Sequence, residues 1–66
     1  MAKYPRLTAE EAESILLRNG FELIRSRGSH RIYIKSKIRV VIPFHSKEIL
    51  HPKIIKQVYQ AIENAE

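Results

Sequence analysis

Three short stretches of alternating side chains, separated by turn residues, constrain the fold of this 66-residue chain more than any other feature. Residues Phe21 to Ser26, His30 to Lys35 and Ile38 to Pro43 each read as a strand. The links between them are too short for a crossover connection, so neighbouring strands must run antiparallel. The sequence therefore predicts a three-stranded antiparallel meander.

Helical patterns flank these strands. Thr8 and Glu11 have the spacing of a capping box, which predicts a helix from about Ala9 to Arg18 that ends at Asn19-Gly20. Pro52 suits the first position of a second helix. The buried stripe expected for that helix comprises Ile54, Ile55, Val58, Tyr59, Ala61 and Ile62. The chain is thus expected to form one α+β domain, residues 1–66, in the order helix, three strands, helix, with both helices on the apolar face of the sheet.

Strand periodicity also assigns residues to the two faces of the sheet. The face expected to form the core carries Phe21, Leu23, Ile32, Ile34, Ile38, Val40 and Ile42. The opposite face receives Ile24, Arg31, Tyr33, Lys35, Arg39 and Val41. Because opposed residues share a face, Ile34 should face Ile38 or Val40, which requires a turn of three or five residues between the second and third strands.

Charge is segregated along the chain. The formal net charge is +5, and no acidic residue occurs between Glu22 and Glu48, where basic residues are frequent. This segregation favours a polyanionic partner, either nucleic acid or an acidic protein, over a merely solvated basic surface. The chain has no cysteine, no apolar run long enough to span a membrane and no signal-like start, so a soluble cytoplasmic protein without membrane association is expected.

His30 is the first candidate for chemistry, because it follows Gly28 and Ser29 at the start of a strand. Glycine at this position permits a backbone conformation that other residues rarely adopt, and an imidazole can exchange protons near neutral pH. A plain hairpin turn explains the same residues. The topology would gather His30, His45, His51 and the starts of both helices at one rim, where free N–H groups favour an anion. Three histidines without cysteine or organised carboxylates make a metal site improbable on spacing, so none is expected.

A basic face with one aromatic residue is the second candidate. Arg31, Tyr33, Lys35 and Arg39 are expected on the exposed side of the sheet. Such a surface can contact phosphates and stack a base. An ordinary solvated sheet face, with Tyr33 as a strand former, is the alternative.

The residues GSHRIYI, followed by VVIPFHSKEI and a closing helix, resemble the HicA toxin family of toxin–antitoxin modules, also called YcfA-like. The resemblance covers nearly the whole chain. It implies a fold similar to the double-stranded-RNA-binding domain and a type II toxin that cleaves mRNA as an endoribonuclease, without metal or cofactor. It also implies neutralisation by a HicB-type antitoxin. The family's catalytic histidine corresponds to His30, Gly28 and Ser29 match the same element, and His45 matches the histidine of the P-x-H segment. Where family members commonly open the last helix with glycine and a small hydroxyl residue, this chain has His51-Pro52-Lys53.

With that resemblance, His30 is the expected general acid or base, and His45 a second proton-transfer or positioning group. The residues expected to bind RNA are Arg27, Arg31, Tyr33, Lys35 and Arg39. Two alternatives stay open: a non-catalytic double-stranded-RNA-binding module, and an inactive family member that only binds an antitoxin. The antitoxin itself is expected to be acidic and to cover His30. The sequence does not fix the oligomeric state.

Overall fold

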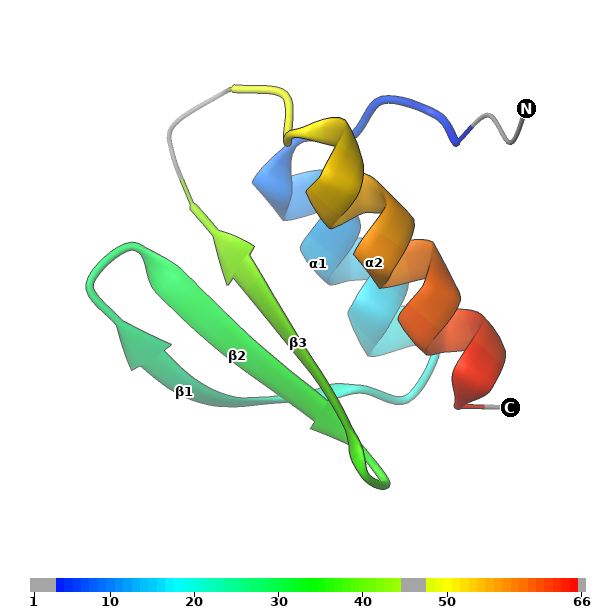
Figure 1. Cartoon of the computed structure of the whole chain (residues 1–66). Coiled ribbons are helices and arrows are strands. Elements are labelled where there is room, and N and C mark those ends of the chain that lie inside the picture. Colours follow the sequence, from blue (N-terminus) through cyan, green and yellow to red (C-terminus); the bar gives the residue numbers. More distant parts are fainter. Residues whose placement is uncertain (1–3, 45–47, 66) are drawn as a thin grey trace.

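The computed structural model describes residues 4–44 and 48–65, and Figure 1 shows their arrangement. The elements are α1 (Ala9–Arg18), β1 (Glu22–Arg27), β2 (His30–Lys35), β3 (Ile38–Pro43) and α2 (Pro52–Asn64). The strands form one antiparallel sheet in the order β1-β2-β3. The predicted α+β fold is confirmed, and only β1 is shifted, by one residue, from its predicted bounds.

Local signals fix both ends of α1. The side chain of Thr8 accepts from the backbone N–H of Glu11 at 3.2 Å, and the Glu11 carboxylate accepts from the N–H of Thr8 at 2.9 Å, which completes the capping box. At the other end Gly20 has φ +92°, and the N–H of Phe21 donates to the carbonyl of Leu16 at 3.0 Å. This is the hydrogen bond of a Schellman motif, and it turns the chain into β1.

The starts of the two helices lie side by side. Thr8 and Ile49 form an antiparallel bridge just before α1 and α2, and the N–H of Leu50 donates to the carbonyl of Leu7 at 2.8 Å. Nδ1 of His51 caps α2 by accepting from the N–H of Lys53 at 3.0 Å. The prediction that both helices begin at one rim is therefore confirmed.

The core lies between the helices and one face of the sheet, with α1 and α2 on the same side (Figure 1). Its buried side chains come from all elements except β1: Leu7, Ala9, Ala12, Leu16, Phe21, Tyr33, Val40, Ile42, Leu50, Ile55, Val58 and Ala61. The apolar stripe predicted for α2 faces this core. Neither helix among the described residues is long and apolar enough to cross a membrane.

The face assignment for β2 was wrong. Tyr33, expected on the exposed side, has no exposed surface and packs in the core opposite Val40. Ile32 and Ile34, expected in the core, are only partly buried and lie on the side that the helices leave uncovered. Val40 and Ile42 of β3 are buried as predicted. Leu23 of β1 pairs with Tyr33 on the helix-facing side but is exposed at the edge of the sheet, so its predicted place in the core was wrong as well.

The turn between β2 and β3 explains the difference. Lys35 pairs with Ile38, so only Ser36 and Lys37 form the turn, not the three or five residues expected. Ser36 takes the left-handed conformation, φ 55°, that such a tight hairpin requires. This register aligns Tyr33 with Val40 and places Arg31 and Lys35 on the helix-facing side.

Candidate active site

The Gly28-Ser29 turn presents His30 at the edge of the molecule. Arg27 pairs with His30, so the hairpin has a two-residue turn, and Gly28 has φ +57° as predicted. Apart from its two chain neighbours, no described residue has an atom within 4 Å of where a Cβ on Gly28 would stand. The positive φ, and not crowding, therefore favours glycine at this position. The turn is held from β3, because the N–H of Phe44 donates to the carbonyl of Ser29 at 2.5 Å.

His30 is exposed and lies between Arg27 on β1 and Pro43 on β3, on the side of the sheet opposite the helices. The turn beside it projects away from the first turns of both helices (Figure 1). The expected rim of three histidines and two helix starts is therefore met only in part. His51 is used as the cap of α2, and His45 lies outside the described residues.

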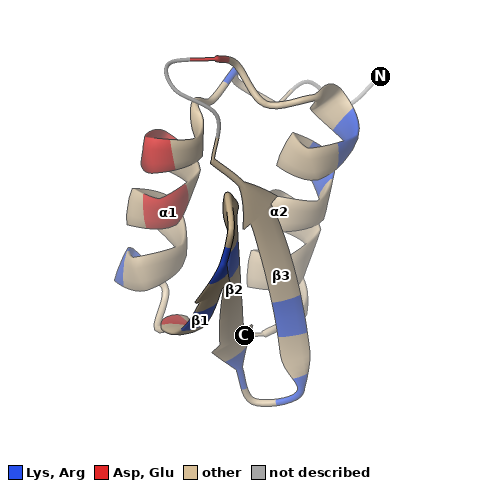
Figure 2. Cartoon of the chain, turned by 90° about the vertical axis from the view of Figure 1, so that its left-hand side faces the viewer, with Lys and Arg blue, Asp and Glu red and all other residues tan. Residues whose placement is uncertain are grey.

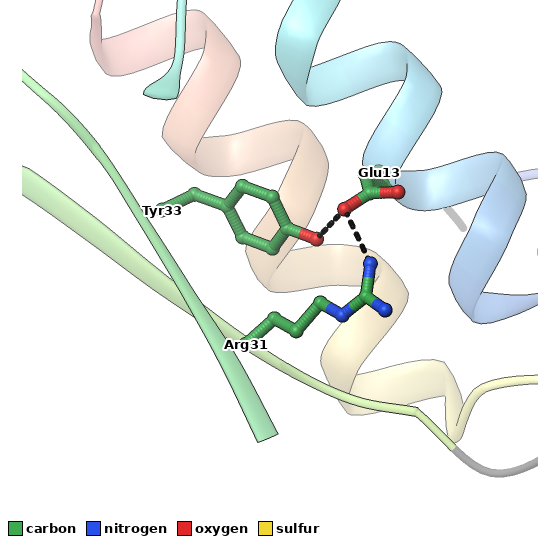
Figure 3. A network of polar contacts seen from close by, with 3 residues as sticks. All are labelled: Glu13, Arg31 and Tyr33. Carbon is green, nitrogen blue, oxygen red and sulfur yellow. Dashed lines mark hydrogen bonds and ion pairs between the residues drawn. The ribbon is translucent and has the colours of Figure 1, made fainter. Parts of the chain in front are cut away.

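A polar network joins β2 to α1 (Figure 3). Oε2 of Glu13 accepts from the hydroxyl of Tyr33 at 2.5 Å and from Nη1 of Arg31 at 3.0 Å. Burial, and then the hydrogen bond to Glu13, raise the pKa of Tyr33 well above its ordinary value. The hydrogen bond to Glu13 likewise raises the pKa of Arg31.

Two of the cations expected to bind RNA are engaged within the protein. The guanidinium carbon of Arg31 lies 4.1 Å from the centre of the Phe44 ring, a cation–π contact, in addition to the ion pair with Glu13. Nζ of Lys35 donates to the carbonyl of Asn19 at 2.7 Å, at the end of α1. The expectation of an exposed basic face with a stacking aromatic was wrong for Arg31, Tyr33 and Lys35.

Arg39 keeps its expected exposure, and so does Arg27 beside His30. Both lie on the uncovered side of the sheet, since Arg39 pairs with Ile34 and Arg27 with His30. Basic residues occur along the strands and their turns, whereas acidic residues gather on α1 (Figure 2). The uncovered side therefore unites a histidine with cations from both edge strands.

The sequence reasoning missed Glu13. A signal was present, because Glu13 follows the buried Ala12 and precedes Leu16 by three positions, which places it at the border of the apolar stripe of α1. A carboxylate at that border faces the sheet and requires partners there. Because Arg31 and Tyr33 were predicted on the side of β2 away from the helices, neither was expected to be a partner of Glu13.

A hollow among the described residues lies elsewhere. A groove of about 690 Å³ runs beside the start of α2 and contains none of the residues assigned to the site from the sequence. Its lining consists of Tyr4, Arg6, Ile49, Leu50, Pro52, Ile55 and Lys56. This groove is therefore separate from the candidate active site at the exposed His30.

Comparison with known families gives a match over most of the chain. The family described as the HicA toxin of bacterial toxin–antitoxin systems matches residues 9–65, from the start of α1 to the end of α2. The chain belongs to this family, as its G-S-H element and closing helix indicated. A toxin role and an antitoxin partner follow from the membership. Neither the curated proteins nor the solved structures gave a match.

Proposed function

We propose that this chain is an endoribonuclease toxin that cleaves mRNA without a metal ion or cofactor, with His30 as its catalytic residue. The observation that carries the proposal is the exposed position of His30 beside Arg27, on a turn whose glycine takes a left-handed conformation. Membership of a family of toxins also supports the proposal that His30 has a catalytic role. The target RNA and the HicB type of the antitoxin are part of the proposal.

Cleavage of RNA by its own 2′-hydroxyl needs few groups. The 2′-oxygen forms a bond to phosphorus and loses its proton to a base, while the bond from phosphorus to the 5′-oxygen breaks and that oxygen receives a proton. His30 serves as one of these proton-transfer groups. Arg27 and Arg39, both exposed on the same side of the sheet, neutralise phosphates of the RNA.

Fewer residues are proposed to bind RNA than were expected from the sequence. Arg31 and Lys35 serve the fold through Glu13 and Asn19, and Tyr33 has no surface on which a base could stack. His45 stays a prediction from the sequence, as the second proton-transfer or positioning group. Gly28 and Ser29 present His30 through the turn.

A cleavage assay on purified protein and a long single-stranded RNA tests the proposal. His30→Ala should lower the cleavage rate about 10²–10⁴-fold, the usual contribution of one acid–base group, and RNA binding should persist. His51→Asn is the matched control, because it replaces a histidine but supplies a side-chain oxygen that can cap α2 in place of Nδ1. A chelator should change nothing.

Equal cleavage by wild-type and His30→Ala protein would exclude His30 as the catalytic residue. A folded wild-type chain that neither cleaves RNA nor slows growth on induced expression would exclude the endoribonuclease. RNA binding without cleavage would favour the non-catalytic binding module, and antitoxin binding alone would favour an inactive toxin.

A further inference from the structure

The turn that presents His30 is tied to the residue that follows β3. Pro43 lies opposite His30 and, as a proline, has no N–H to donate. The next residue, Phe44, donates its N–H to the carbonyl of Ser29 at 2.5 Å. Because Ser29 directly precedes His30, the position of Phe44 constrains the backbone where the histidine begins its strand.

The ring of Phe44 is anchored on the helix-facing side of the sheet. It is partly buried and packs against the core. The guanidinium carbon of Arg31 lies 4.1 Å from the centre of this ring, where a cation is attracted by the electron-rich aromatic face. Phe44 lies just beyond the end of β3, so its position depends on these side-chain contacts more than on strand pairing.

Arg31 is itself fixed by α1. Its Nη1 donates to Oε2 of Glu13 at 3.0 Å (Figure 3). A guanidinium is planar, so its edge can donate to a carboxylate while its face stacks on an aromatic ring. A series of contacts therefore leads from Glu13 through Arg31 and Phe44 to the carbonyl that precedes His30.

We infer that Arg31 and Phe44 are positioning residues, which hold the backbone at His30 in place for proton transfer. Arg31 lies on the helix-facing side of β2 and His30 on the other side, so Arg31 acts through the turn and not on the RNA. A displacement of about 1 Å at a reacting group can lower a rate about 10²-fold. The inference rests on the proposed function, which makes the orientation of His30 important.

Four variants separate the two contacts from general stability. Phe44→Leu keeps an apolar side chain for the core but removes the aromatic face, whereas Phe44→Tyr keeps both. Arg31→Gln removes the charge that binds the ring and the carboxylate. Lys35→Gln is the matched control, because Nζ of Lys35 donates to the carbonyl of Asn19 and so ties the other end of β2 to α1.

Cleavage is measured over a range of RNA concentrations, at a temperature where denaturation curves show each variant to be folded. Arg31→Gln and Phe44→Leu should lower kcat at least about tenfold and leave KM within about twofold, because the histidine is displaced while the RNA-binding surface is kept. Phe44→Tyr and Lys35→Gln should stay within about twofold of wild type in kcat. Loss of stability alone would not lower kcat in a protein that is still folded.

Hydrogen exchange at the Phe44 amide, measured by NMR, tests the same contacts without RNA. The N–H of Phe44 is protected by its bond to the carbonyl of Ser29. After correction for the intrinsic rate of each sequence, Arg31→Gln and Phe44→Leu should accelerate this exchange about threefold to tenfold. Lys35→Gln should leave it unchanged.

Wild-type kcat in Arg31→Gln and Phe44→Leu would overturn the inference, and so would an equal fall in Lys35→Gln. A higher KM with unchanged kcat in Arg31→Gln would make Arg31 an RNA-binding residue instead. Equal losses in Phe44→Tyr and Phe44→Leu would exclude a role for the aromatic ring. If Arg31→Gln does not fold, this comparison of the Phe44 variants decides the inference.

The exchange measurement distinguishes failure of the inference from failure of the proposed function. A wild-type chain that cleaves no RNA would contradict the proposed function. Unchanged exchange at Phe44 in Arg31→Gln and Phe44→Leu would contradict the inference, whether or not the wild-type chain cleaves RNA.

Discussion

The hydroxyl of Tyr33 donates a hydrogen bond to Oε2 of Glu13, which joins the central strand β2 to helix α1. Arg31 shares the same carboxylate oxygen (Figure 3). The network lies at the edge of the core, where Tyr33 is fully buried but Glu13 and Arg31 keep some contact with water. The network holds one side of β2 against α1, while the other side of β2 faces away from the helices.

Removing the Tyr33 hydroxyl should destabilise the fold. Tyr33→Phe keeps the buried ring but removes a hydrogen bond to a charged acceptor, so the free energy of unfolding should fall by about 1.5 kcal/mol, measured by urea denaturation. Tyr59→Phe is the control, because that ring stacks on Tyr4 near the surface. Similar losses in both variants would contradict a special role for the Tyr33 hydroxyl.

The difference in unfolding free energy between wild type and Tyr33→Phe should decrease at alkaline pH. The pKa of Tyr33 is raised in the folded state, so above about pH 10 the unfolded chain loses this proton first and is favoured. The contribution of the Tyr33 hydroxyl to the unfolding free energy is fully present below that pH and falls as the pH rises further. Unfolding of wild type and Tyr33→Phe between about pH 8 and 11 checks this. A constant difference between them would exclude the raised pKa.

Gly28 should resist substitution for a conformational reason. Gly28→Ala forces a residue with a Cβ into the left-handed region at φ +57°, with an expected loss of about 1–2 kcal/mol in unfolding free energy. Gly28→Asn should recover part of it, because asparagine tolerates that conformation. Among the residues that the structure describes, none beyond the two chain neighbours comes within 4 Å of the new Cβ, so the loss is attributed to the backbone conformation and not to a clash. Equal stabilities of the alanine and asparagine variants would contradict this explanation.

The cap of α2 gives a prediction independent of the site. His51→Ala removes the acceptor for the N–H of Lys53 and should lower the unfolding free energy by about 1 kcal/mol, whereas His51→Asn should stay near wild type. Thermal unfolding of both variants measures the difference. If the two unfold at the same temperature, the side chain of His51 does not cap the helix.

The salt dependence of RNA binding should distinguish Arg39 from Arg31. Each phosphate contact to single-stranded RNA contributes about 0.7 to the slope of log affinity against log salt. In a His30→Ala background, Arg39→Gln should reduce the slope by about this amount, whereas Arg31→Gln should not, because Arg31 is held by Glu13 and Phe44. If Arg31→Gln reduces the slope and Arg39→Gln does not, Arg31 binds RNA and this prediction is wrong.

The local backbone around His30 could be predicted because its signals are local. Gly28 requires its turn through its own backbone conformation, and His30 begins its strand where the pattern placed it. The contacts of Arg31, Tyr33 and Lys35 could not be predicted in this way. Their partners lie on α1, 16 to 20 residues away in sequence, and depend on which face of β2 the helices cover.

The sequence by itself determined the elements and their order. Capping at Thr8, the left-handed Gly20 and the proline that opens α2 act within a few residues, so their effects could be predicted before the fold was known. Only the tertiary structure decided which side of β2 is buried. Alternation divides a strand into two sets but does not say which set the helices cover.

Hydrophobicity favoured the isoleucines of β2, and the structure buries Tyr33 instead. The two-residue turn at Ser36 aligns Tyr33 with Val40, and Glu13 of α1 supplies the partner that its hydroxyl needs in the core. Arg31 and Lys35 can share that side because their long stems carry the charged ends out to α1. Because Tyr33 packs against the helices, Ile32 and Ile34 lie with His30 on the side of the sheet that the helices leave uncovered.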